Sequence, residues 1–149
     1  MKAVTIVAAT MVFFAAPAVQ AQAQDTQPGH FFSSHNSYNE AKVPQAIKAF
    51  TQCLASENAG VQESAMAHLA MLKLVRPEID NEIVVKQLEQ LSMTAPLEST
   101  RYKAYIASQL FRTPASFASA RNVEYEDGDE FFGALATQLR NSLLSYRGQ

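Results

Sequence analysis

The stretch GVQESAMAHLAMLKLVRPE, residues 60–78, decides the fold that the sequence predicts. Between Ala65 and Val75 only His68 and Lys73 interrupt a run of small and apolar side chains. The composition is helical, and Pro77 ends the helix because proline cannot continue one. We therefore predict a helix over about 61–75. Because it is apolar nearly all round, we expect it to be covered on at least two sides.

Amphipathic helices are predicted on both sides of this buried helix. Pro44 suits the first turn of a helix over about 43–56, and we expect the helix to end at Asn58 and Gly60, two residues that tolerate left-handed geometry. A third helix is expected over about 82–93, capped by Asp80 or Asn81, and a fourth over about 97–111. No segment alternates apolar and polar residues over the length of a strand, so the sequence predicts no sheet.

The second and fourth helices repeat one pattern. At a constant offset of 39 positions, the triplet Ala65, His68, Leu72 corresponds to Ala104, Ala107, Phe111. A period near 40 built from two antiparallel helices is typical of stacked helical hairpins.

The segment VPQAIKAFTQCLASENAGVQESAMAHLAML resembles one HEAT repeat, and IVVKQLEQLSMTAPLESTRYKAYIASQLF resembles a second, weaker copy. Asn58 stands where the family has a turn aspartate, and Gln62 where it has a basic residue. The resemblance implies an all-α array with repeats over about 43–75 and 82–111. The chain is also similar to small exported bacterial proteins.

The C-terminal third is predicted to cap this array. We expect a short helix capped by Thr113, then a last helix opened by a capping box of Asp127 and Glu130. Its inward stripe is predicted as Phe132, Leu135, Leu139 and Leu143. Residues 40–149 would thus form one all-α domain of about six helices, with the cap over 113–147.

The first residues have the order of a secretory signal peptide: Lys2, an apolar run, and small residues before a cut after Ala21 or Ala23. The apolar run is shorter than the roughly 20 residues that a spanning helix needs, so we expect export rather than a membrane anchor. Residues 22–39 are polar and aperiodic, which predicts a flexible tether. The protein would then be periplasmic or secreted.

The net charge and the cysteine content limit which functions the protein can have and how its fold is stabilised. The net charge of −2 argues against nucleic-acid or polybasic membrane binding. Cys53 is the single cysteine, so packing rather than disulfides must hold the fold. We expect Cys53 to be a small buried apolar residue on a helix face.

His68 is the residue with the most chemistry to offer. Its repeat partner is Ala107, so we expect a histidine packed between helices. The alternative is a soft-metal site for copper, in which His68 acts with Met66, Met71 or Cys53, and Cys53 or Met93 supplies the remaining ligands. Met66 and His68 are two residues apart and do not share a helix face, which disfavours it.

Other groups carry weaker signals. His30 and His35 lie in the tether without further ligands, and the acidic run at 124–130 lacks the spacing of a calcium loop. No Gly-x-Ser-x-Gly, His-Glu-x-x-His, helical Glu-x-x-His or phosphate-binding glycine motif is present in the sequence. We therefore predict no enzyme and no cofactor, with a site hidden in the tertiary structure as the remaining alternative.

The architecture that the resemblance implies suggests binding, because helical arrays offer broad surfaces. We predict an exported scaffold or adaptor that binds another exported protein or peptide. The predicted contact residues face outward from the second helices: Glu63, Lys73, Arg101, Tyr102 and Tyr105. Self-association is a further expectation if the array is weakly capped.

Overall fold

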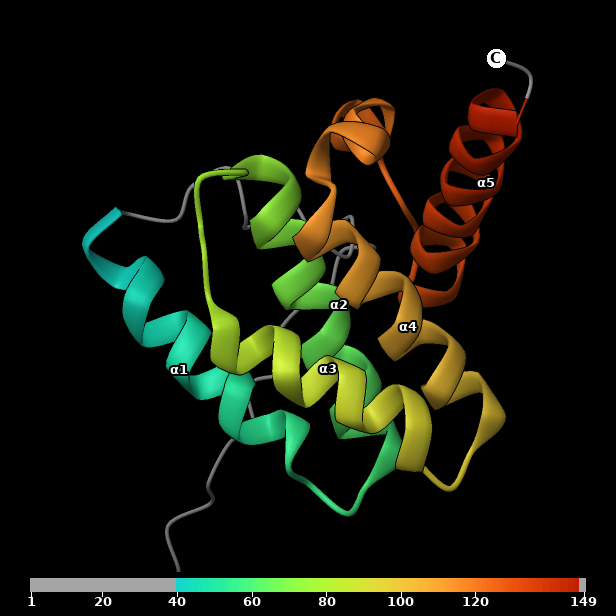
Figure 1. Cartoon of the computed structure of the whole chain (residues 1–149). Coiled ribbons are helices and arrows are strands. Elements are labelled where there is room, and N and C mark those ends of the chain that lie inside the picture. Colours follow the sequence, from blue (N-terminus) through green and yellow to red (C-terminus); the bar gives the residue numbers. More distant parts are fainter. Residues whose placement is uncertain (1–39, 148–149) are drawn as a thin grey trace, which may run out of the picture.

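Residues 40–147, the part of the chain that the computed structural model describes, form five α-helices and two 3-10 helices (Figure 1). No β-strand occurs in this range, and the all-helical class predicted from the sequence is confirmed. The predicted signal peptide and tether, residues 1–39, lie outside the described residues. The elements are η2 (Glu40–Lys42), α1 (Val43–Leu54), α2 (Ala59–Val75), α3 (Glu82–Thr94), α4 (Glu98–Arg112), η3 (Pro114–Asn122) and α5 (Gly128–Arg147).

The helices pack in three layers. Helices α1 and α2 form one antiparallel hairpin and α3 and α4 a second, and these hairpins stack with α1 against α3 and α2 against α4. The C-terminal elements η3 and α5 both pack on α2 and α4 (Figure 1). The α2–α4 layer therefore lies between the α1–α3 layer and the C-terminal segment.

This middle position explains the composition of α2. Most of its side chains are buried, including Met66, Leu69 and Leu74 at 0–1% exposure on different sides of the helix. The expectation that α2 is covered on at least two sides is confirmed. A helix with neighbours on both faces has no need of a wide polar stripe, which is why α2 reads as apolar nearly all round.

The C-terminal segment covers a helix face rather than the end of an array. Phe117 of η3 and Phe131 of α5 are fully buried, and Tyr125 between them is 3% exposed. The Arg121 Nε donates to the Leu74 carbonyl at 2.7 Å, which fixes η3 to the end of α2. Residues 113–147, predicted as a cap on the end of the array, therefore cover α2 and α4.

The turn between α1 and α2 differs from its prediction. Asn58 does not end α1: it is the N-cap of α2, and its Oδ1 accepts the Val61 N–H at 3.2 Å. No residue among 40–147 has a positive φ, so neither Asn58 nor Gly60 uses the left-handed geometry that it tolerates. Gln62 of α2 joins the two helices, because its Nε2 donates to the carbonyl of Leu54 at the end of α1 at 3.3 Å and to the Ser56 carbonyl at 2.7 Å.

Side-chain caps define the other helix starts. Asn81 caps α3 by accepting the N–H groups of Ile83 and Val84, as predicted. Asp127 accepts the Glu130 N–H at 2.8 Å, which is one half of the predicted capping box. The Glu130 carboxylate accepts the N–H of Glu126 at 2.7 Å rather than that of Asp127.

Two details of the C-terminal segment are corrected. Thr113 makes no side-chain cap to η3, because its hydroxyl donates to the Gln109 carbonyl at the end of α4. Leu143 is not part of the inward stripe of α5: it is 57% exposed, whereas Leu135 is fully buried. The stripe ends at half-buried Leu139 because α5 extends past the helices on which it packs (Figure 1).

Candidate functional site

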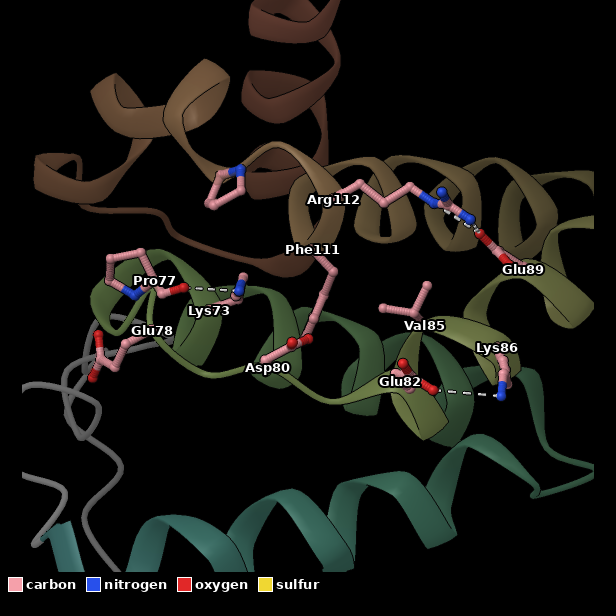
Figure 2. A pocket seen from close by; sticks show the side chains of 11 residues that line it. Lys73, Pro77, Glu78, Asp80, Glu82, Val85, Lys86, Glu89, Phe111 and Arg112 are labelled. Atoms are coloured by element: carbon pink, nitrogen blue, oxygen red, sulfur yellow. Dashed lines mark hydrogen bonds and ion pairs between the residues drawn. The ribbon is translucent and has the colours of Figure 1, made fainter.

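A hollow lies between the α2–α3 loop, α3 and the C-terminal end of α4, and we call it the α3 groove (Figure 2). Its volume is about 620 Å³. Apolar side chains line part of it, namely Pro77, Val85, Phe111 and Pro114. Charged side chains form the rest: Lys73, Glu78, Asp80, Glu82, Lys86, Glu89 and Arg112.

Lys73 holds one wall of the α3 groove in place. The prediction that it faces outward is wrong, because the residue is only 5% exposed. Its Nζ donates to the carbonyl oxygens of Pro77 at 2.8 Å and Ile79 at 2.5 Å, and lies 5.6 Å from the centre of the Phe111 ring. Lys73 thus supplies donors to the α2–α3 loop, and its bond to the Pro77 carbonyl is drawn in Figure 2.

Two ion pairs occupy the α3 side of the groove. Lys86 pairs with Glu82 one helical turn away at 3.6 Å, and Arg112 of α4 pairs with Glu89 of α3 (Figure 2). The Arg112–Glu89 contact joins Nε and a terminal nitrogen of the guanidinium to one carboxylate oxygen. Each of these four charges therefore has an opposite charge beside it.

A ridge of solvent-facing residues runs along α4 into this groove. Its members are spaced by four, three, four and three positions, which places them on one helix face. Tyr102 is 56% and Tyr105 44% exposed. We call this surface the α4 ridge: Glu98, Tyr102, Tyr105, Gln109 and Arg112. Arg112 belongs to both surfaces, so the ridge and the groove are continuous.

The other predicted contact residues are engaged within the fold. Arg101 is half-buried, and its guanidinium donates to the Ala95 carbonyl at 2.8 Å and the Pro96 carbonyl at 3.1 Å, which closes the α3–α4 loop. Glu63 accepts from the Thr100 hydroxyl at 2.6 Å and from the Lys103 ammonium at 2.5 Å. Of the five predicted residues, Tyr102 and Tyr105 are the two that the structure leaves exposed.

The Glu63–Lys103 pair links three helices, because Lys103 also reaches Asp129 in the first turn of α5 at 2.5 Å. Burial by itself raises the pKa of the Glu63 carboxyl, but hydrogen bonds from Lys103, Thr100 and Ser99 and the charge of Lys103 outweigh it, so the pKa is lowered. Burial likewise lowers the pKa of the Lys103 ammonium, and its two carboxylate partners outweigh it, so the pKa is raised. Both groups are held in their charged forms.

His68 and Cys53 line a second hollow, of about 380 Å³, between α1 and α2. His68 is half-buried, and its ring stacks on Phe50 with centroids 4.9 Å apart. Burial lowers the pKa of its imidazole below the ordinary value. Cys53 is half-buried rather than fully buried.

The structure brings together only part of the copper site that the sequence offered as an alternative. Met66 and Met71 are buried at 0% and 4% exposure and do not line the hollow that Cys53 and His68 share. Met93 is 73% exposed at the end of α3. Among residues 40–147 no three His, Cys, Asp or Glu side chains are placed to hold one metal ion. His30 and His35 lie outside the described residues.

Comparison of the chain with protein-family models, with curated proteins and with solved structures finds no match. Over residues 40–147, no helix has both the length and the apolar content needed to cross a membrane.

Sequence reasoning missed the α3 groove. Its residues come from the end of α2 and the α2–α3 loop, from α3, and from the end of α4 with the start of η3. They are up to 41 positions apart in the sequence, from Lys73 to Pro114. The one local signal is the segment RPEIDNE, residues 76–82, in which three acidic residues follow the helix stop at Pro77.

Proposed function

We propose that this protein is an exported, non-enzymatic binding module, and that the α4 ridge with the α3 groove binds a segment of another exported protein. The observation that carries the proposal is the exposure of Tyr102 and Tyr105 on the helix face that leads to Arg112 and the groove. Tyrosine and arginine are the side chains most often found as anchors of protein interfaces.

The ridge is rigid as well as exposed. The opposite face of α4 carries Ala104, Ile106, Ala107 and Leu110, all at 0% exposure, so the helix is fixed on the domain. A surface whose backbone is already fixed loses little conformational entropy on binding.

The geometry suits an elongated partner segment. Tyr105 and Arg112 are seven residues apart on one face, which is about 10 Å along the helix. A segment that crosses both tyrosines and continues past Arg112 enters the α3 groove. The resemblance to HEAT repeats supports binding of this kind. The first residues have the order of a secretory signal peptide, which supports an exported partner.

The proposal is tested by quantitative affinity capture. The chain from Gln22, immobilised through a C-terminal tag, is incubated with the exported fraction of its host, and retained proteins are measured by mass spectrometry. The test variant is Tyr102→Ser/Tyr105→Ser. The matched control is Leu143→Ser/Leu144→Ser, which removes two other exposed apolar side chains, 57% and 60% exposed, from the last turns of α5.

We expect at least one protein to be retained by the wild type and the control and to fall at least tenfold with the tyrosine variant. Its complex with the purified wild-type chain then confirms a direct contact. Equal retention by both variants contradicts the proposal, provided that circular dichroism shows both variants to be folded.

A further inference from the structure

We infer that the α3 groove receives a basic side chain, an arginine or lysine next to an apolar residue, from the bound partner segment. This inference rests on the proposed function and names the chemical class of the segment. It comes from the charges that line the groove, its apolar part and the way Lys73 fixes the loop.

The charges that line the groove leave two carboxylates for a partner. Glu82 and Glu89 are paired with Lys86 and Arg112. Glu78 and Asp80 are exposed, and neither makes an ion pair with any residue of the described part of the chain. A cation that enters the groove therefore meets two carboxylates without displacing an existing pair.

Lys73 is the remaining cation that lines the groove, and it does not neutralise Glu78 or Asp80. Its ammonium is 2.5 to 2.8 Å from two backbone carbonyl oxygens of the same loop, inside the fold. An opposing cation is thus attracted from the solvent side by Glu78 and Asp80, where partner groups arrive.

The loop that carries these carboxylates is pre-organised. The two Lys73 hydrogen bonds fix residues 77 and 79, and the Ile79 N–H donates to the Arg76 carbonyl at 3.1 Å. Glu78 and Asp80 therefore stand on a fixed backbone, which reduces the entropy lost on binding.

The apolar part of the groove favours arginine or lysine over a small cation. Val85 and Phe111 lie beside the charged wall (Figure 2). Long basic side chains pack their aliphatic stems on such surfaces while their charged ends stay near carboxylates and water. The hollow of about 620 Å³ also has the size of pockets that hold small organic groups.

The test is a heteronuclear NMR titration of the labelled chain, residues 22–149, with two capped pentapeptides, GRFRG and GEFEG. We expect the basic peptide to shift the amide signals of residues 78–86 and 109–113 in a saturable way, and the acidic peptide not to. The variant Glu78→Gln/Asp80→Asn is expected to weaken binding about tenfold, since two exposed ion pairs are lost. The control Glu57→Gln/Glu126→Gln, which neutralises two exposed acids elsewhere, is expected to bind as the wild type does.

Three results overturn the inference: equal shifts from both peptides, unchanged affinity in the Glu78→Gln/Asp80→Asn variant, or the same pattern of shifts from calcium chloride alone. The calcium result would assign Glu78 and Asp80 to a metal site. If no peptide binds but the tyrosine-dependent capture succeeds, only the inference fails. If the basic peptide binds the groove but capture does not depend on the tyrosines, the inference holds for an isolated peptide and the proposed function fails.

Discussion

Replacing Glu63 by glutamine tests how the C-terminal segment is held on the α2–α4 layer. Glu63 is the acceptor for Lys103, Thr100 and Ser99, and Lys103 continues the network to Asp129 in α5. Glutamine keeps the shape and one acceptor oxygen but removes the charge. The Lys103 ammonium is then left with Asp129, whose side chain is 80% exposed, as its carboxylate partner.

The size of the effect follows from burial. Exposed ion pairs contribute about 0–1 kcal/mol, whereas removing one partner of a fully buried pair costs about 3–5 kcal/mol. The side chains of Glu63 and Lys103 are 21% and 14% exposed, which lies between these limits. We therefore expect Glu63→Gln to lower the free energy of unfolding by about 2 kcal/mol. The assay is urea denaturation at pH 7, with Glu57→Gln as the exposed control.

The same variant has a pH signature. Because the pKa of Glu63 is lowered on folding, its stabilisation is present above the unfolded pKa of about 4.5 and is lost as the pH falls through the lower folded value. Glu63→Gln should remove this part of the acid dependence. A variant within 0.5 kcal/mol of the wild type at pH 7, with an unchanged acid slope, would refute the reasoning.

Three further predictions concern the loop, α5 and His68. Lys73→Gln should speed amide hydrogen exchange of Ile79 at least tenfold, because hydrogen bonds from a charged donor contribute about 1.5–3 kcal/mol each; unchanged exchange contradicts the assigned role. In urea denaturation, Leu135→Ala should lower the free energy of unfolding by about 2–5 kcal/mol and Leu143→Ala by less than about 0.5 kcal/mol. Equal losses would contradict the conclusion that the buried stripe of α5 ends at Leu139. NMR titration should give His68 a pKa below its ordinary 6.5. Neutral His68 then contributes to the free energy of unfolding above pH 6.5, and this contribution is lost as the pH falls below that value. His68→Gln should reduce the pH dependence of the free energy of unfolding in this range.

The helix positions were predictable because their signals are local. Pro44 and Asn81 mark helix starts through the backbone groups beside them, and the capping box of Asp127 and Glu130 spans only four positions. Asn58 was misassigned because asparagine is common both after and before helices. Its extended backbone, with φ of −86° and ψ of 115°, shows which role it has here.

The candidate site was predictable only in part. Tyr102 and Tyr105 are exposed, as expected, but Lys73 and Glu63 turned out to serve the fold. Whether a charged side chain on a helix is exposed depends on what covers that helix. Here η3 and α5 pack on α2 and α4, the helices that carry the predicted contact residues. That packing joins residues far apart in the chain, which periodicity does not report.

The sequence by itself determined the helical class, the approximate bounds of the helices and the buried nature of α2, because propensity, caps and apolar periodicity act within a few residues. Only the tertiary structure decided that the C-terminal segment covers α2 and α4, that Lys73 binds backbone carbonyls and that Glu63 pairs with Lys103. It also created the α3 groove, whose walls come from three segments. These features depend on contacts between residues distant in sequence, and their geometry is set by how the layers pack rather than by any local pattern.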